Sequence, residues 1–303
     1  MIRFAYPEEK EELKKIWQEA FVMDDGGYTD YFFQERYDAG KHYVLHNDET
    51  IVSIASSFAS AYMINDRMLR ASMIVGVATK EAYQGQGYMA KLLNEIISQL
   101  EHQELLTMIQ AYEPNIYKKF GFEVVYKRQK YYFSRETYDV GSSFNVLDYY
   151  EVHDLVKVYA RFVKHFSGYK VREVSDFELY FKEIEALGGH LMTVYRANEI
   201  KGYFVYRIVD DVVEIDECIY LDLKTLNQII SYALKIAPRL ELTVSEYEDL
   251  GRRFKYNAKE LEDYTMVRIN DYKLWNKLFE CEVDNAYDAL TLVNKPLYMR
   301  EDT

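Results

Sequence analysis

The stretch Tyr83–Met89, YQGQGYM, places two glycines one residue apart in a chain of 303 residues that has only 13 glycines. An apolar run, SMIVGVAT at 72–79, precedes it, and the segment MAKLLNEIISQL at 89–100 follows it. The apolar residues of the second segment recur at helical spacing and form one continuous face. The pattern predicts a buried strand, a glycine turn and an amphipathic helix in succession.

A helix start exposes unpaired backbone N–H groups and the positive end of the helix dipole. Glycines just ahead of it would let a pyrophosphate approach the backbone closely and accept several N–H bonds. Gly85 and Gly87 alone fit a tight turn without a ligand equally well. The pattern is not a P-loop, because no Gly-Lys-Ser/Thr follows, and it lacks the third glycine of the dinucleotide fingerprint.

The segments around this turn predict a mixed α+β or α/β fold. The run at 72–79, the helix at 89–100 and the apolar run LLTMIQA at 105–111 form a strand–helix–strand crossover. A polar and glycine-containing stretch at 134–145 suggests a boundary, so we expect domains at 1–138 and 139–303. Strand and helix patterns beyond the boundary follow a similar order, but CIYLDLKTLNQII at 218–230 passes from strand to helix without glycines.

Composition restricts the class of protein. The net charge of −13 argues against nucleic acid as a partner, because phosphate backbones are bound by clustered Lys and Arg, and it favours a cationic substrate. Cys218 and Cys281 are far apart, and the six histidines have no ligand spacing, so neither a disulfide framework nor a metal site is expected. The N-terminus has no signal-type apolar core and no run reaches membrane-spanning length, which predicts a cytoplasmic protein without a membrane partner.

The segments GVATKEAYQGQGYMAKLL at 76–93 and AYEPNIYKKFGFE at 111–123 carry a resemblance to a known family. The first is similar to the Q/R-x-x-G-x-G/A motif of the GNAT superfamily of N-acetyltransferases, with Met89 where Gly or Ala is usual. Together they resemble the Eis-type (enhanced intracellular survival) branch, as does TMVRINDYKLWNKLF at 265–279. That resemblance implies tandem GNAT folds with a degenerate second copy. It also implies a shortened member without the C-terminal sterol-carrier-like domain, since only 24 residues follow that segment.

The resemblance implies that acetyl-CoA is the co-substrate, with no metal. The strand before the turn would offer free backbone groups to the pantetheine arm, the turn would bind the pyrophosphate, and the end of the next strand would flank the coenzyme. The cofactor-binding residues expected on this basis are Val77, Ala78, Thr79, Gly85, Gln86, Gly87, Tyr88, Met89, Ala90, Tyr112 and Glu113.

Tyr117 matches the family's general acid, which protonates the leaving thiolate. In the Eis-type branch the base is the C-terminal carboxylate, which here would be that of Thr303. We expect no scaffold to hold the tail NKPLYMREDT at 294–303, because the third domain is absent. Asp24 and Asp25 lie where related enzymes bind the amine, although a solvated capping turn explains them equally well, and proton transfer to water is a third alternative for the base.

Two classes of function stay open from the sequence. The first is an N-acetyltransferase that acts on a primary amine of a cationic small molecule or a lysine side chain. The second is a non-catalytic acyl-CoA-binding or sensor protein that retains the cleft. A degenerate second copy would shape the acceptor pocket or form an oligomer contact, which leaves a homo-oligomer open.

Overall fold

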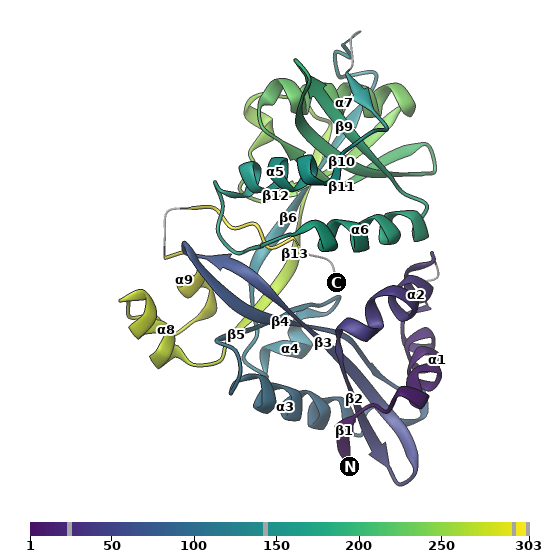
Figure 1. Ribbon diagram of the computed structural model, residues 1–303, viewed down its shortest axis with the longest axis vertical. Helices are drawn as coiled ribbons and strands as arrows, with labels where there is room; N and C mark the ends of the chain where they lie inside the picture. Colours follow the sequence, from purple (N-terminus) through teal and green to yellow (C-terminus); the bar gives the residue numbers. More distant parts are fainter. Residues whose placement is uncertain (23–25, 142–144, 293–294, 301–303) are drawn as a thin grey trace. The chain divides into compact units, whose positions relative to one another are not determined.

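The computed structural model describes residues 1–22, 26–141, 145–292 and 295–300. These residues divide into two compact units, and each contains segments that are distant in the sequence (Figure 1). Unit 1 comprises the described residues of Met1–Val125 and Tyr264–Asn294, and unit 2 comprises those of Tyr126–Asp263 and Lys295–Arg300. The division into domains at 1–138 and 139–303 stays a prediction, and the limits of these two units differ from it.

The sheet of unit 1 has the strand order β1-β2-β3-β4-β5-β13. Neighbouring strands are antiparallel except β4 and β5, which are parallel because helix α3 connects them. Its strands are β1 Ile2–Phe4, β2 Lys41–Asn47, β3 Thr50–Ile64, β4 Arg67–Thr79, β5 Leu106–Gln110 and the end of β13 Ala258–Ile269. Its helices and helical turns are η1 Pro7–Glu9, α1 Lys10–Ala20, α2 Tyr28–Tyr31, η3 Phe32–Arg36, η4 Tyr37–Ala39, η5 Glu81–Tyr83, α3 Tyr88–Leu100, α4 Pro114–Lys118, α8 Tyr272–Phe279 and α9 Ala286–Leu290.

Both faces of the unit 1 sheet are covered by packed side chains. Successive side chains of a strand point to opposite faces, so neighbouring residues of β2 lie in two different core clusters. Tyr43 and Leu45 of β2 pack in the cluster that contains the apolar face of α3, whereas Val44 packs in the cluster of α1 and its aromatic neighbours. The helix predicted at 89–100 is confirmed, and Leu92, Leu93 and Ile96 are fully buried.

The sheet of unit 2 has the order β6-β12-β11-β10-β9-β7, and its parallel pair is β11 and β12, which helix α7 connects. The strands in this order are β6 Glu123–Ser134 from Tyr126 on, β7 Val146–Leu147, β9 His190–Arg196, β10 Glu199–Val209, β11 Val212–Tyr220 and β12 Arg239–Ser245. Unit 2 also contains β8 Tyr169–Lys170, which lies outside this order, and the start of β13, which is next to β6. Its helices and helical turn are α5 Val152–Val163, α6 Val174–Ala186, α7 Leu223–Ile236 and η6 Leu250–Arg252. The order β9-β10-β11, helix, β12 repeats the order β2-β3-β4, helix, β5 of unit 1.

The core of unit 2 also lies on both faces of its sheet. Phe204 of β10 packs in the cluster of α7, and the preceding Tyr203 packs in the cluster of α5 and α6. The expected fold class, tandem mixed sheets with flanking helices, is therefore confirmed.

The last sheet strand in each unit comes from the other half of the sequence. β6 follows β5 in the chain but pairs with β12 along Arg128–Ser134, and β13 follows β12 but pairs with β5 along Thr265–Ile269. Each half of the sequence therefore completes the sheet of the other unit. In the described part of the chain, no helix is long and apolar enough to cross a membrane.

Candidate functional site

The parallel strands β4 and β5 separate toward their carboxyl ends. Their pairing covers Ala71–Ile74 on β4 and Leu106–Ile109 on β5. β4 continues to Thr79, and its pairing with β3 shows a bulge, since Ser56 pairs with Val75 but Ile54 pairs with Ala78. Among the described residues, the last part of β4 therefore pairs with β3 but not with β5. This arrangement leaves one backbone edge of 75–79 open for a ligand.

The three residues expected to meet a pantetheine arm lie in this part of β4, but they face different surroundings. Val77 packs against the cluster of α3, and Ala78 is buried in the cluster of α1. The Ser53 hydroxyl donates to the Ala78 carbonyl at 2.8 Å and lies 2.9 Å from the Thr79 hydroxyl. The Ala78 carbonyl therefore already has a partner on the β3 side, and the groups left for a ligand are those on the β5 side.

The glycine turn brings the chain from β4 into α3 in a left-handed conformation. The φ angles of Gly85 and Gly87 are +74° and +79°, a region that side chains with a Cβ rarely adopt. A Cβ built on either glycine would have no heavy atom within 4 Å, leaving its own chain neighbours aside. The side chain of Gln84 donates to the Thr79 carbonyl at 3.2 Å, and that of Gln86 to the Ala82 carbonyl at 3.3 Å, so both glutamines fix the turn.

Helix α3 begins without a side-chain cap. Gly87 is its N-cap residue, and the first intrahelical bond runs from the Lys91 N–H to the Gly87 carbonyl at 3.1 Å. The N–H groups of Tyr88, Met89 and Ala90 precede that bond and lie in the first turn, where backbone donors have no partner within the helix. The first turn has no acidic residue either. The start of α3 can therefore accept an anion.

Residues from these separate segments meet on one cluster. Val77, Tyr88, Met89, Ala90 and Tyr117 are all partly buried against the apolar core that contains the buried face of α3. Tyr117 lies in the short helix α4, which follows the end of β5. The end of β4, the start of α3 and the Tyr117 side chain therefore share one region of unit 1.

Burial determines the state of the Tyr117 phenol. Its ring meets the ring of Phe122 edge-on, with centroids 6.5 Å apart. Desolvation raises the pKa of Tyr117 to about 12, because the charged phenolate is disfavoured away from water. The phenol is therefore neutral near pH 7 and keeps a proton that it can donate.

The remaining expected site residues lie outside this cluster. Tyr112 and Glu113 follow β5 and are exposed, with 86% of the Tyr112 surface accessible, and Glu113 is the N-cap residue of α4. Asp24, Asp25 and Thr303 lie outside the described residues.

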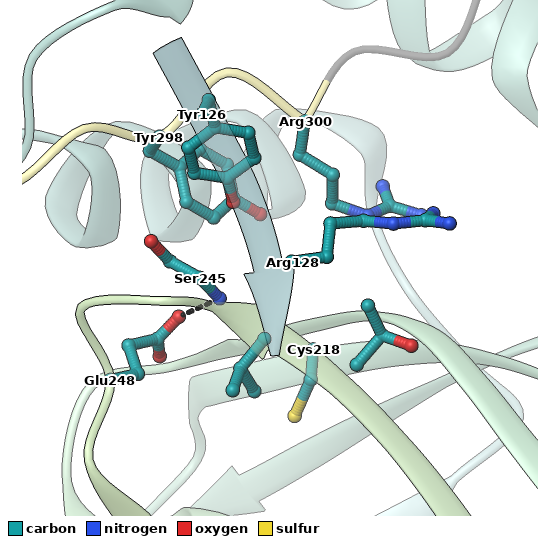
Figure 2. Close-up of a pocket in the computed structure, with 9 residues that line it drawn as sticks. Tyr126, Arg128, Cys218, Ser245, Glu248, Tyr298 and Arg300 are labelled. Carbon is teal, nitrogen blue, oxygen red and sulfur yellow. Dashed lines mark hydrogen bonds between the residues drawn. The ribbon is translucent and has the colours of Figure 1, made fainter. Parts of the chain in front are cut away.

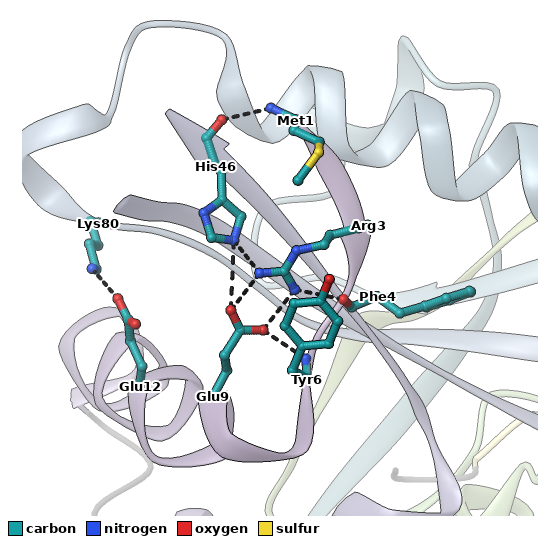
Figure 3. Close-up of polar contacts among 8 residues, drawn as sticks. All are labelled: Met1, Arg3, Phe4, Tyr6, Glu9, Glu12, His46 and Lys80. Atoms are coloured by element: carbon teal, nitrogen blue, oxygen red, sulfur yellow. Dashed lines mark hydrogen bonds and ion pairs between the residues drawn. The ribbon is translucent and has the colours of Figure 1, made fainter. Parts of the chain in front are cut away.

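Three polar residues near the site were not identified from the sequence. Ser53 contacts the end of β4, as described above. Lys80, which follows β4, pairs with Glu12 of α1 at 2.9 Å, and the Lys91 ammonium lies 5.3 Å from the ring centroid of Tyr88 (Figure 3 for Lys80). Two lysines that flank a glycine turn are a signal that could have indicated an anion site.

A second set of contacts in Figure 3 holds α1 beside the first strands. Arg3 of β1 forms a two-pronged ion pair with Glu9, at 2.6 and 2.8 Å, and also contacts the His46 ring of β2 at 2.8 Å. With Lys80 fixed to α1 as well, the segment that enters the glycine turn is anchored at its start. In the described residues, no group of three or more His, Cys, Asp or Glu could hold a metal ion.

Comparison with known protein families identifies the same part of the chain. Residues 1–125 match the family model described as an acetyltransferase (GNAT) domain. The matched region contains the β4–β5 opening, the glycine turn and Tyr117. No curated protein matches the chain.

Solved structures share the fold over most of the chain at low sequence identity. A conserved protein of unknown function from Enterococcus faecalis V583, described as a probable N-acyltransferase, is 18% identical with a TM-score of 0.77, covering 89% of this chain and 72% of that one. Eis1 from Mycobacterium abscessus is 15% identical with a TM-score of 0.70, covering 91% and 75%. A putative acetyltransferase from Pyrococcus horikoshii is 13% identical with a TM-score of 0.58, covering 100% and 95%.

Proposed function

We propose that this protein is an acyltransferase that moves the acetyl group of acetyl-CoA to a primary amine, and that residues 1–125, which match the acetyltransferase family model, carry the reaction. The observation that carries the proposal is the combination of an open strand edge and an uncapped helix start. Val75–Thr79 of β4 have no partner on the β5 side among the described residues, and the chain then enters α3 through Gly85 and Gly87 without a cap.

The residues of this region fit the two polar parts of a coenzyme A molecule. The amide groups of a pantetheine arm can pair with the open edge of Val77–Thr79, as an additional strand would. The pyrophosphate suits the backbone of Gly85–Ala90, because these N–H groups and the α3 dipole attract anions, and the glycines leave room for close approach. Lys91 adds positive charge at the first turn of α3, whereas the charge of Lys80 on the other side is paired with Glu12. Tyr112 and Glu113 would flank the coenzyme from the end of β5.

Tyr117 is the proposed proton donor. When an amine attacks the thioester carbonyl, the carbon–sulfur bond breaks and the sulfur leaves as a thiolate, which a nearby donor stabilises by hydrogen bonding or protonation. The Tyr117 phenol is neutral because its pKa is raised to about 12 by desolvation, so it is in the correct protonation state across the physiological range.

The acceptor in this proposal is the amine of a cationic small molecule or of a lysine side chain, since a chain with net charge −13 attracts cations. Asp24 and Asp25 are proposed to bind it. The proton that the amine loses would go to one of these aspartates, to the carboxylate of Thr303 or to water. The variants Asp24→Asn, Asp25→Asn and a deletion of 301–303, which leaves the buried Arg300 in place, distinguish these routes by their effect on turnover.

The test is CoA release from acetyl-CoA in the presence of a panel of amines, combined with mass measurement of each amine product. Turnover with at least one amine, together with its loss in Gly87→Glu, supports the proposal. Binding of acetyl-CoA without turnover for every amine would instead favour an acyl-CoA-binding or sensor protein. Absence of any CoA binding would overturn both functions.

A further inference from the structure

The described end of the chain is buried in unit 2. The exposed fractions of Leu297, Tyr298, Met299 and Arg300 are 0%, 3%, 2% and 6%. The expectation that no scaffold holds the tail is therefore wrong for residues 297–300, whereas Thr303, the residue that this expectation concerned, lies outside the described residues. The rest of unit 2 therefore covers four consecutive side chains of this segment.

The segment lies where the parallel strands of unit 2 separate. Pairing of β11 with β12 ends at Ile215 and Leu242, which correspond in register to Ile74 and Ile109 of unit 1. Beyond this point the Arg300 Nε donates to the Asp216 carbonyl of β11 at 2.7 Å. The Ser245 hydroxyl at the end of β12 donates to the Leu297 carbonyl at 2.9 Å. The segment therefore contacts both strands at an opening equivalent to the one proposed for the cofactor in unit 1.

A loop of unit 2 pairs with the other backbone edge of the segment. The Ser167 N–H donates to the Pro296 carbonyl at 2.9 Å, and the Tyr298 N–H donates to the Ser167 carbonyl at 2.8 Å, which is the pattern of a short parallel bridge. The next residue, Gly168, has a φ of +80°, and a Cβ on it would lie 2.7 Å from the Met299 Cγ. This close approach requires glycine, so the loop is shaped to fit the segment.

The side chains of Tyr298 and Arg300 lie among aromatic and charged residues of unit 2. The ring of Tyr298 contacts those of Phe162 and Phe166, with centroids 5.5 and 5.3 Å away. Tyr298 and Arg300 also line a small pocket together with Tyr126 and Arg128, all within unit 2 (Figure 2).

Arg300 reaches a buried anion. Its guanidinium pairs with the fully buried Glu217, which Arg172 also holds through two bonds of 2.8 and 2.9 Å. Burial would raise the pKa of Glu217, but the charges of Arg172 and Arg300 lower it to about 2, so the carboxylate is ionised at neutral pH. The opening therefore selects an extended peptide with an aromatic residue and, two positions later, an arginine.

We propose that the opening between β11 and β12 is a peptide-binding site, and that its ligand is the chain's own segment 297–300. This segment occupies in unit 2 the place that the described residues of unit 1 leave open between β4 and β5. The inference goes beyond the proposed function and does not depend on it, because it concerns a peptide ligand in the other unit.

The experiment cuts the segment from the rest of the chain, so that its binding can be measured. A protease recognition sequence inserted between Asn294 and Lys295 of the full chain allows the folded protein to be cut, which leaves 295–303 as a free peptide. Native mass spectrometry after desalting should show this peptide still bound one to one. Loss of the peptide from the cut protein during desalting would overturn the proposal.

Arg300→Met tests the recognition, and Arg252→Met, which removes an exposed arginine of unit 2, is the matched control. We expect the Arg300→Met peptide to dissociate at least tenfold faster, whereas Arg252→Met should retain it like the unsubstituted protein. Equal retention in Arg300→Met and the control would contradict the proposal. Glu217 keeps Arg172 as a partner in Arg300→Met, which favours folding of the variant.

A competition measurement needs no folded variant. Isotope-labelled synthetic peptide 295–303 is added in excess to the cut, unsubstituted protein, and its exchange with the bound peptide is followed by mass. The labelled peptide should exchange in, and the same peptide with Arg300→Met should not. Equal exchange of both peptides would show that Arg300 is not recognised and would overturn the proposal.

Discussion

The two units contain the same opening but differ in what their sequence places around it. In unit 1 the pairing of β4 and β5 ends at Ile74, and in unit 2 that of β11 and β12 ends at Ile215. A bulge follows in both, because Val205 pairs with Glu217 whereas the next residue, Tyr206, pairs with Ile215. The shared topology creates an opening in each unit, so the ligand of each opening depends on a few local residues.

The starts of the two crossover helices show the difference most clearly. Helix α3 begins at Gly87 with no side-chain cap, whereas α7 begins at Asp222, whose carboxylate accepts from the Thr225 N–H at 2.9 Å and pairs with Arg196. That cap satisfies a backbone donor and places a negative charge at the helix start, which repels a phosphate. We therefore propose an anion site at the start of α3 in unit 1, whereas the start of α7 in unit 2 is capped by a carboxylate.

The largest effect should follow from placing a negative charge at the start of α3, as the cap does at the start of α7. Gly87→Glu places a carboxylate and a Cβ at the proposed pyrophosphate site, so CoA binding should be abolished in calorimetry. Gly188→Glu is the matched control, because Gly188 also has a positive φ, +64°, and open space around its Cβ, but lies in unit 2. Unchanged CoA affinity in folded Gly87→Glu, or equal loss in the control, would contradict the assignment.

Tyr117→Phe should have the next largest effect. The ring and its contact with Phe122 remain, so CoA affinity should stay the same, while turnover should fall by roughly 10²-fold or more, the usual scale for a lost acid–base catalyst. Tyr287→Phe, at an exposed position in unit 1, is the control and should retain full turnover. Turnover in Tyr117→Phe that matches the control would mean that Tyr117 only packs against the core.

A smaller effect is expected from Glu248 in the pocket of unit 2. Burial raises its pKa to about 7, although the Tyr220 hydroxyl and the Ser245 N–H donate to it at 2.6 and 2.8 Å (Figure 2 for Ser245). Because the folded state holds this proton more tightly than the unfolded state, the group's contribution to stability falls as pH rises from about 4.5, the ordinary value, through 7. The loss corresponds to roughly 3 kcal/mol above pH 7.

The amide of Glu248→Gln resembles the protonated acid, so this variant should not lose unfolding free energy as the pH rises through 7. Relative to the unsubstituted protein, the variant should gain unfolding free energy between pH 5 and pH 8, as measured by denaturant titration at each pH. Glu262→Gln, which replaces a partly exposed carboxylate of unit 2, should show no such gain. Parallel pH profiles for Glu248→Gln and the unsubstituted protein would show that the carboxyl titrates normally.

The sequence predicted the elements whose signals are local. Helix α3 followed from apolar residues at helical spacing, and the turn at Gly85 and Gly87 followed from the rarity of glycine in this chain. The repeated order of strands and helices in the second half was also visible, as was the lack of glycines before α7. Periodicity and turn residues report on neighbours in the sequence, so they are sufficient for these features.

The features that the sequence did not predict depend on contacts between distant segments. No local signal indicates that β6 pairs with β12 rather than completing the sheet of its own half. The role of 295–300 was also missed, although the apolar run Leu297–Met299 in a terminal segment is a sign of burial. Arg300 and Glu217 are 83 residues apart in the sequence, so only the fold brings them into contact.

The central claim is that only unit 1 offers a coenzyme site, because its helix start is uncapped, whereas α7 of unit 2 is capped by Asp222 and the described segment 297–300 fills the opening of unit 2. The most direct test is the stoichiometry of CoA binding to the full chain, measured by calorimetry with Gly87→Glu in parallel. One CoA per chain in the unsubstituted protein and none in Gly87→Glu is the predicted result. Two CoA per chain, or one that persists in Gly87→Glu, would contradict the claim.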